Sequence, residues 1–260
     1  MLILDMASRY EKFKFPGKGY REYVYLKSAP ATDSSTLQLE KTILYDLKDC
    51  QQIVECFGDG FSVENRKLVY NLLLEFAAGG TLVDLMKDSG DRIEEWDASK
   101  YTCMLLRGLS HMHQKGYVHC DLEPDNILVF LSKKKDGSLD YSLKIADFGS
   151  AKIISSDNLD YGRSQLKTLL GVARDDVATD IWSLGCIVAE MLVGKSYVMD
   201  LKKSCKDNEE NCLEILPKFL SEDAKDFLRR CLTMNKKERW TSERLLHHPF
   251  ITEFDEVNLN

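Results

Sequence analysis

Short apolar stretches rich in β-branched and aromatic residues alternate with polar residues in the first third of the chain. This pattern is typical of β-strands, in which successive side chains point to opposite faces. It predicts strands over residues 23–27, 53–57 and 68–76, with Gly58-Asp59-Gly60 as a turn between the last two. We therefore expect a small β-sheet near the beginning of the chain.

One helix is predicted between the first two of these strands. Ser35 is followed three residues later by Gln38, a spacing that indicates a capping box at a helix N-terminus. Leu37, Leu44 and Leu47 then fall on one face, so we expect an amphipathic helix that packs against the sheet.

Beyond residue 80 the apolar residues recur with the period of a helix. Residues 94–115 predict a long amphipathic helix, with Gly116 placed to end it. The side chains expected in the core from this helix are Trp96, Met104, Leu105, Leu109 and Met112. Further helices are predicted over residues 178–193, 222–232 and 242–247, and two short strands over 127–131 and 143–146 around an Asp136-Gly137 turn.

A strand-rich segment followed by a helical one predicts an α+β fold with two lobes. We expect a single domain over residues 1–260, with a β-rich lobe containing one helix at about 1–76 and a larger helical lobe at about 77–260. A short connector around residues 75–80 would join them. The cleft between such lobes is a natural place for a ligand.

The composition is that of a folded intracellular chain. Its 260 residues are 44% hydrophobic with only 15 Gly and 5 Pro, which excludes disorder as the main state. The 42 acidic residues outnumber the 35 basic ones, for a net charge of −7, which argues against broad nucleic-acid binding. The longest apolar run, residues 127–131, is far shorter than the roughly 20 residues that cross a bilayer, so no membrane association is expected.

The cysteines and the N-terminal segment indicate the cellular compartment of the protein. The eight cysteines form no CxxC pair, and the segment before Asp5 lacks the features of a secretory leader. We therefore expect reduced thiols in an intracellular protein of the cytoplasm or nucleus.

Two predicted loops carry acidic residues in informative positions. Residues 118–126 follow the long helix and place Asp121 five residues before the amide of Asn126. Residues 145–149, Ile-Ala-Asp-Phe-Gly, place Asp147 between a strand and a turn that glycine permits. Acids in loops are often only solvated surface groups, but the joint placement of both motifs favours a functional interpretation.

Together with Asp180-Ile181-Trp182-Ser183-Leu184-Gly185 and Arg239-Trp240, these motifs resemble those of the eukaryotic protein kinase family. The resemblance covers residues 23 to 251. Residues 27–29, 71–75, 118–121 and 239–241 are similar to plant mitogen-activated protein kinase kinase kinases, and Pro124 favours the serine/threonine branch. The resemblance implies a two-lobed kinase fold that transfers the γ-phosphate of ATP to a protein hydroxyl in a mitogen-activated protein kinase cascade.

The resemblance also implies roles for individual residues. Asp147 would ligate Mg²⁺ and Asn126 would supply a second metal contact, because hard cations select oxygen ligands. Asp121 would accept or orient the proton of the substrate hydroxyl. Lys27 would pair with Glu40 and present its ammonium to the α- and β-phosphates of ATP.

The remaining implied residues concern the base of ATP and the partners. Backbone groups between Glu75 and Ala77 would face adenine, with Leu74 behind it and Leu128 below it, although ordinary core positions explain both leucines equally well. ATP and Mg²⁺ are the expected cofactors. A protein substrate, such as a mitogen-activated protein kinase kinase, is the expected partner of a monomeric chain.

Two departures from the family pattern concern the phosphate site. Residues 17–24 resemble the glycine loop of the family, yet only two residues separate Val24 from Lys27, too few for the strands and hairpin in between. We keep Lys27, because Glu40 follows at a helical position, and expect a shortened or missing phosphate cover. Glu123 replaces a lysine of the family and places an acid near the transferred phosphate.

Two further departures concern the activation segment. Cys120 stands where many kinases have an arginine, so a phosphorylated activation loop would lack its usual partner. No A-P-E triplet lies between Asp147 and Asp180, so Arg239 loses the glutamate that the family pairs with it. We hypothesise that Asp175 or Asp176 substitutes, because an unpaired interior charge would cost several kcal/mol.

These departures leave three interpretations open. The chain is an active kinase, a pseudokinase that binds nucleotide or acts as a scaffold, or an incomplete version of a longer active kinase. Glu123 and the thin first lobe favour the pseudokinase. The combination of Asp121, Asn126 and Asp147 favours the active enzyme.

Two other candidate sites are less well supported. His111, His113 and His119 could suggest zinc, but two of them close a helix and the third belongs to the loop motif. The lysines at 133–135 are flanked by acids and a turn, which favours a solvated hairpin tip over a docking patch.

Overall fold

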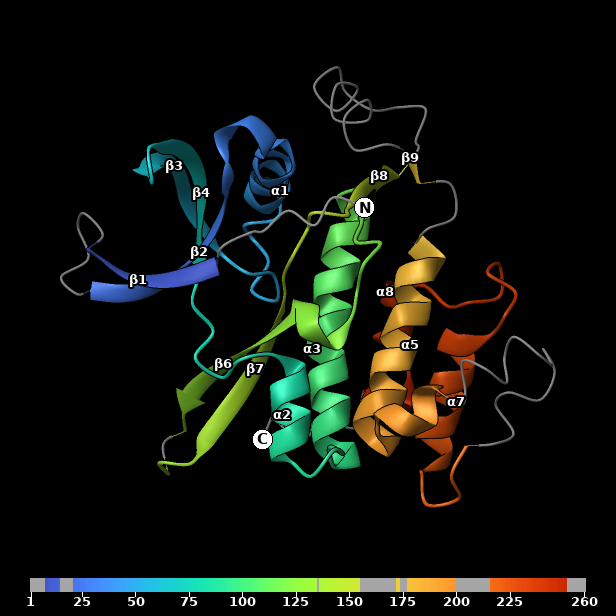
Figure 1. The fold of residues 1–260 in the computed structure, drawn as a ribbon. Coiled ribbons are helices and arrows are strands. Elements are labelled where there is room, and N and C mark those ends of the chain that lie inside the picture. The colour runs from blue at the N-terminus through green and yellow to red at the C-terminus, as the bar shows by residue number, and fades with distance from the viewer. Residues whose placement is uncertain are drawn as a thin grey trace.

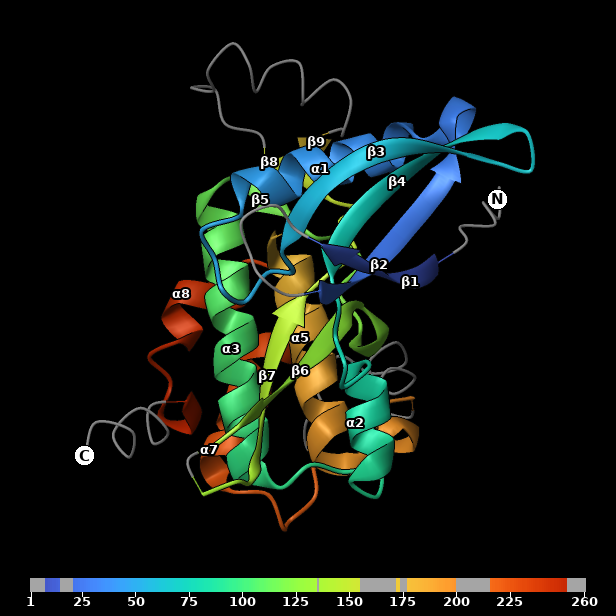
Figure 2. The same cartoon turned by 90° about the vertical axis from the view of Figure 1, so that its left-hand side faces the viewer.

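The computed structural model describes residues 8–14, 21–134, 136–154, 172–173, 177–199 and 216–251. These residues form two lobes, as Figure 1 shows. The smaller lobe contains a four-stranded sheet and one helix, and the larger lobe contains the remaining helices and two small sheets. In the view of Figure 2 the sheet of the smaller lobe lies above the long helix of the larger lobe.

The sheet of the smaller lobe is antiparallel throughout. Its strands are β1 (Ser8–Lys14), β2 (Arg21–Pro30), β3 (Cys56–Glu64) and β4 (Lys67–Glu75), in the spatial order β1-β2-β4-β3. The central strands β2 and β4 carry the buried apolar residues, as their alternating pattern predicts. Strand β1 was not predicted, because its sequence SRYEKFK contains too few apolar residues to show the pattern.

Strand β3 corrects one prediction. Gly58-Asp59-Gly60 lies inside this strand, where a bulge between Cys56 and Gly58 accommodates the extra residue, and is not a turn. The turn falls instead at Asn65-Arg66, whose φ angles of 48° and 63° match the left-handed turn that joins tightly paired strands. Ile53, the predicted start of this strand, forms only an isolated bridge with Ile145.

Helix α1 (Ser35–Asp46) follows the short 3-10 helix η1 (Ala31–Asp33) and packs against β2 and β3. Its apolar face buries Leu37, Ile43 and Leu44, as predicted for the two leucines. The N-terminal cap is one residue earlier than expected: Ser34 is the N-cap, and Gln38 Nε2 donates to Ser34 Oγ at 2.9 Å. Gln38 therefore ties the first turn together without a reciprocal capping box.

The larger lobe is built around helix α3 (Glu95–Gln114). This helix contacts α5 (Val177–Val193) and α8 (Ser242–Leu245), and α5 in turn contacts α7 (Glu222–Leu232). A fifth helix, α2 (Leu82–Asp88), was not predicted, although Thr81 and Asp84 form the capping box that marks its start. None of the helices in these described ranges combines the length and apolar character needed to cross a membrane.

Strands border the helices of the larger lobe on the side of the cleft. β6 (Ile127–Lys133) and β7 (Leu139–Ile145) form the predicted hairpin, in which Gly137 adopts a φ of 86°. β5 (Tyr117–Val118), β8 (Lys152–Ile154) and β9 (Val172–Ala173) form a second small sheet. The 3-10 helix η2 (Pro124–Asn126) leads directly into β6.

The helix ends follow the sequence signals closely. Gly116 and Gly194, with φ angles of 79° and 90°, lie beyond the ends of α3 and α5, as their predicted stop roles require. Ser221 caps α7 by accepting a hydrogen bond from the Ala224 N–H. Trp96 is the exception, because it is 49% exposed and was wrongly placed in the core.

The two lobes are joined by backbone hydrogen bonds as well as by the connecting chain. The Val54 N–H donates to the Ile145 carbonyl at 3.0 Å, and the Ile145 N–H donates to the Gln52 carbonyl at 2.8 Å. Lys144 Nζ also donates to Glu75 Oε2 at 2.6 Å. The end of β7 is therefore fastened to the smaller lobe.

We predict that Gly185→Ala destabilises the larger lobe by about 1–3 kcal/mol. A Cβ at this position on α5 would lie 2.6 Å from Cys231 Cβ and 2.8 Å from Leu232 Cδ2, both on α7. The matched control is Gly60→Ala, where an added Cβ meets nothing within 4 Å. Free energies of unfolding from urea titrations will measure both changes, and equal values would contradict this packing.

Candidate active site

A cavity of about 320 Å³ lies between the two lobes. Strands β2 and β4 and helix α1 line it from the smaller lobe, while η2, β6 and the segment after β7 line it from the larger one. The candidate site residues that border it are Lys27, Glu40, Leu74, Glu75, Ala77, Asn126, Leu128 and Asp147. The structure therefore brings together residues that are more than 100 positions apart in the sequence.

Lys27 occupies the centre of this arrangement. It lies on β2 opposite Leu72 and is only 7% exposed. Its Nζ is 2.7 Å from Glu40 Oε2 and 2.9 Å from Asp147 Oδ1. Burial alone would lower the pKa of Lys27, but the two carboxylates outweigh it and raise the pKa above its ordinary value.

Glu40 connects α1 to the segment that follows β7. It is fully buried, and its Oε1 accepts a hydrogen bond from the Phe148 N–H at 3.3 Å. Phe148 is itself buried and packs edge-on against His119 at 5.1 Å between ring centroids. The position of α1 is thereby coupled to the position of Asp147 and its neighbours.

Asp147 is held in an unusual conformation. Its φ of 61° lies in the left-handed region, which costs a non-glycine residue about 1 kcal/mol or more. The Gly149 N–H donates to Asp147 Oδ1 at 3.2 Å. Burial alone would raise the pKa of Asp147, but Lys27 and this hydrogen bond lower it below its ordinary value. The carboxylate therefore stays ionised while its side chain remains 43% exposed.

The loop that carries Asp121 is anchored by the buried Asp180 at the start of α5. Asp180 Oδ2 accepts hydrogen bonds from the His119 N–H and from His113 Nε2, each at 2.9 Å, and its Oδ1 accepts one from the Cys120 N–H at 3.0 Å. Cys120 has a φ of 65°, so this anchor also holds a strained residue. Sequence reasoning used Asp180 only as part of the resemblance and gave His113 no such role.

Asn126 and Asp121 are joined by a hydrogen bond. Asn126 Nδ2 donates to the Asp121 carbonyl at 2.8 Å, which leaves its amide oxygen available to a ligand in the cavity. Asp121 itself is exposed and lies outside the lining of the cavity. Its carboxylate is therefore accessible to a group that approaches from solvent.

The acids of this loop form a locally negative surface. Glu123 is exposed, and partial burial followed by the charges of Asp121, Asp125 and Asp147 raises the pKa of its carboxyl. Glu75 is different, because its carboxylate is already paired with Lys144. The charge of its carboxylate is therefore already balanced within the protein.

Arg239 is stabilised by partners that the sequence did not suggest. Its guanidinium donates to the carbonyls of Thr233 and Ala178, each at 2.8 Å, and lies 4.7 Å from the centre of the Trp182 ring. Asp175 and Asp176 lie outside the described residues, as do Gly17 and Gly19. These carbonyl oxygens and the aromatic face thus lower the cost of burying the Arg239 guanidinium.

The donor set of the cavity suits Mg²⁺ bound together with a phosphate. No group of three or more His, Cys, Asp or Glu side chains within the described ranges could hold a metal alone. Mg²⁺ typically takes one or two carboxylates and completes its shell with phosphate oxygens and water. Asp147 and the amide oxygen of Asn126 border the same cavity and match that requirement.

The family model of the protein kinase domain matches residues 22–251. The chain belongs to the protein kinase family, and its two-lobed α+β architecture is that of a kinase domain. It is 38% identical over 247 residues to mitogen-activated protein kinase kinase kinase 20 of Arabidopsis thaliana, covering 88% of this chain and 69% of the relative. It is 32% identical to mitogen-activated protein kinase kinase kinase 17 of the same plant, covering 96% of this chain and 68% of the relative.

We predict that Lys27→Met destabilises the fold by about 3–5 kcal/mol, because it leaves Glu40 as a buried carboxylate without a cation. Glu40→Gln should cost less, since Lys27 keeps Asp147. Burial already raises the pKa of Glu40. In the Lys27→Met variant this carboxyl therefore has a higher pKa in the folded protein than in the unfolded chain. The folded variant is therefore favoured at low pH and loses stability as pH rises through that raised pKa.

The stability gap between Lys27→Met and the unmodified protein should accordingly narrow from pH 8 to pH 5.5 in urea titrations. Lys41→Met is the control, because the Lys41–Asp59 pair is partly exposed and should contribute about 0–1 kcal/mol. A gap that stays constant with pH would contradict the burial of an ionised Glu40.

Proposed function

We propose that the chain is a serine/threonine protein kinase that transfers the γ-phosphate of ATP to a protein hydroxyl. The observation that carries this proposal is the position of Lys27 between Glu40 and Asp147 in the cleft between the lobes. One ammonium beside two carboxylates, in a cavity with apolar walls, suits a ligand that has an apolar base and a polyanionic tail.

Each end of the cavity has a different task. Leu74 and Leu128 give an apolar surface to a purine ring, and the main chain from Glu75 to Ala77 borders the same region. At the opposite end, Lys27 would bind phosphate oxygens, and Asn126 and Asp147 would hold Mg²⁺. The bound nucleotide would supply the phosphoryl group, and the metal would neutralise its charge.

Asp121 would orient the substrate hydroxyl and take up its proton. Its accessible carboxylate and the hydrogen bond that Asn126 donates to its main-chain carbonyl support this role. The anchoring of this loop by Asp180 keeps the geometry in place before the substrate arrives.

The relatives suggest the biological setting. Their names describe kinases of mitogen-activated protein kinase kinases, so the proposed substrate is such a kinase and the proposed pathway is a mitogen-activated protein kinase cascade. We further propose a single kinase domain over residues 1–260, acting as an intracellular monomer in the cytoplasm or nucleus.

Glu123 favours a second candidate function. Its carboxylate adds negative charge beside Asp121 and Asp147, where the transferred phosphate would carry negative charge as well. A chain with this repulsion could bind nucleotide or partner proteins and transfer phosphate slowly, which is the behaviour of a pseudokinase.

The first test is the thermal stability of the protein with ATP alone and with ATP and Mg²⁺. We predict a metal-dependent rise in the melting temperature, because ligands that bind only the folded state stabilise it. Asp147→Asn should remove the metal-dependent part, while Asp49→Asn, an exposed change of equal charge in the smaller lobe, should retain it. Transfer of labelled phosphate to a basic protein then separates a kinase from a scaffold, and absence of both effects would refute the proposal.

The second test is Glu123→Lys. We predict that this change raises the rate of phosphate transfer about 10²-fold, because a cation replaces an acid near the developing charge. The control Glu123→Gln removes the repulsion without adding a cation and should give a smaller increase. Initial rates at saturating ATP will measure both, and a rate unchanged by either substitution would show that Glu123 does not act on the transferred phosphate.

A further inference from the structure

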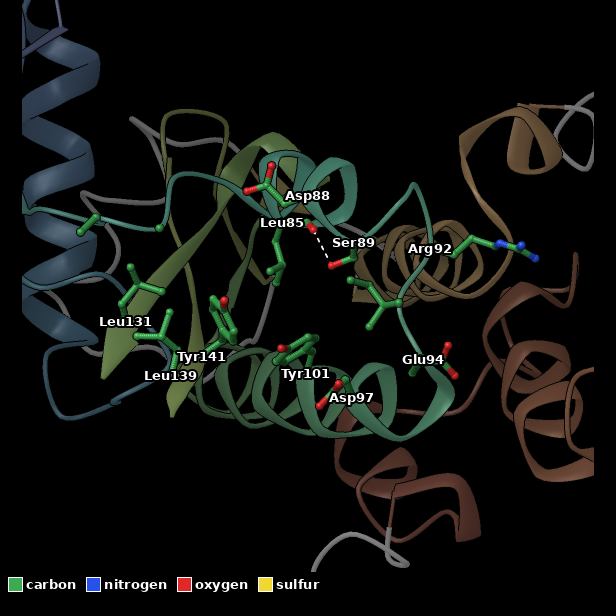
Figure 3. Close-up of a pocket in the computed structure, with 13 residues that line it drawn as sticks. Leu85, Asp88, Ser89, Arg92, Glu94, Asp97, Tyr101, Leu131, Leu139 and Tyr141 are labelled. Carbon is green, nitrogen blue, oxygen red and sulfur yellow. Dashed lines mark hydrogen bonds between the residues drawn. The ribbon is translucent and has the colours of Figure 1, made fainter. Parts of the chain in front are cut away.

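The cavity between the lobes is small for the ligand that the proposed function requires. Figure 3 shows a larger cavity of about 460 Å³ elsewhere in the molecule, between α2, α3 and the β6–β7 hairpin. The candidate active-site cavity measures only about 320 Å³, close to the lower end of the roughly 300–1,000 Å³ that ligand pockets span. A nucleoside triphosphate with its metal ion is a large ligand, so the side chains that limit this volume affect how well it binds.

Tyr25 borders this cavity and belongs neither to its phosphate end nor to the connector between the lobes. It lies on β2, two residues before Lys27. Side chains alternate between the two faces of a strand, so Tyr25 and Lys27 project from the same face into the cleft. Val24 and Leu26 are buried on the opposite face. Each residue advances a strand by about 3.3 Å, which places Tyr25 about 7 Å from Lys27 along β2.

Tyr25 lies at the end of the cavity that a purine ring would occupy. It pairs with Leu74 across β2 and β4, so both side chains share one face of the sheet. Leu128 borders the same cavity from β6 of the larger lobe. A base would have to lie between Leu128 and the sheet, which is the space that Tyr25 faces. A nucleotide that runs from the connector at Glu75 to Lys27 must therefore pass the tyrosine ring.

The ring of Tyr25 is not tied in place by polar contacts. Its side chain is partly buried and packs against the main hydrophobic core, but it forms no hydrogen bond, ion pair or ring contact with the described residues. Phe76, the other aromatic residue that lines the cavity, differs because its ring lies 5.8 Å from that of Tyr23. Partly exposed side chains change rotamer readily, so Tyr25 can alternate between a position over the cavity and one directed away from it.

We propose that Tyr25 restricts the base end of the cleft by its size, and so determines which nucleotides bind and how tightly. This inference rests on the proposed function, since it concerns the same nucleotide site. With the ring over the cavity, a base of one ring fits more readily than a purine of two rings. A purine binds only the fraction of molecules in which the ring has turned aside, and its apparent Kd rises by the inverse of that fraction. Tyr25 is thus a specificity-determining residue and takes no part in phosphate transfer.

The test compares ATP, CTP and inorganic tripolyphosphate, each with Mg²⁺. The base of CTP has a single ring, and tripolyphosphate has no base. Isothermal titration calorimetry with the full chain measures the Kd of each ligand. Tyr25→Ala should tighten ATP binding about tenfold, as expected if the ring is turned aside in about one molecule in ten. CTP should gain about threefold or less, and tripolyphosphate should change by less than about twofold, because the change removes a clash that only a base meets.

Matched variants separate the size of the side chain from its other properties. Tyr25→Phe keeps the ring and removes only the hydroxyl, so its Kd for ATP should equal that of the unmodified protein. Tyr25→Val introduces a smaller residue that suits a β-strand, should give an intermediate Kd, and keeps the test decisive if Tyr25→Ala does not fold. The control Tyr45→Ala removes a tyrosine that is 47% exposed on α1 of the same lobe, and should leave the Kd of every ligand unchanged.

The outcomes distinguish this inference from the proposed function. A gain for ATP in the smaller variants that is absent in Tyr25→Phe supports the inference, even if the unmodified protein binds ATP too weakly to transfer phosphate. Equal or weaker ATP binding by the smaller variants overturns it, and leaves the proposed function intact when the unmodified protein binds ATP. An equal gain for all ligands also overturns it, since the effect would not be confined to the base. If neither the unmodified protein nor the variants bind ATP, both proposals are wrong.

Discussion

The ammonium of Lys27 is the point on which the geometry of the cleft depends. It lies within 3 Å of a carboxylate from α1 and of a second carboxylate from the segment after β7. Lys27 and Glu40 depend on each other here, since either of them alone would be a costly buried charge, whereas Asp147 is partly exposed. The Phe148 N–H adds a second connection to Glu40. The orientation of α1 is therefore set by electrostatics and not only by the leucines that it buries.

Two residues of the loops from the larger lobe have strained backbone conformations. Cys120 and Asp147 have φ angles of 65° and 61°, and each is held by partners buried behind it. Asp180 accepts the N–H of Cys120, and His119 Nε2 lies 3.0 Å from the Ala146 carbonyl. Backbone strain of this kind persists only where surrounding contacts fix it, and it concentrates where side chains must be aimed. Helix α5 thus contributes to the cleft without touching it.

The features that the sequence predicted best are the helix boundaries, which local signals control. Helices α3, α5 and α7 begin and end within about a residue of expectation, because glycines and N-cap residues act within a single turn. The juxtaposition of Lys27, Glu40 and Asp147 followed from a family resemblance and could not follow from spacing. The prediction of a turn at Gly58-Asp59-Gly60 was wrong because glycine and aspartate occur in strand bulges as well as in turns. The partners of Arg239 are carbonyl oxygens, which no residue pattern reveals.

The attachment of β7 to the smaller lobe determines how the cleft can open. Hydrogen bonds through Val54 and Ile145, and the Lys144–Glu75 ion pair, fix one edge. An opening of the cleft that keeps these contacts would be a rotation of one lobe about that edge. Lys27 and Glu40 would move together with the smaller lobe, whereas Asp147 would remain with the larger lobe. Such a rotation would separate Lys27 from Asp147, whereas the lysine would keep its partner Glu40 on α1.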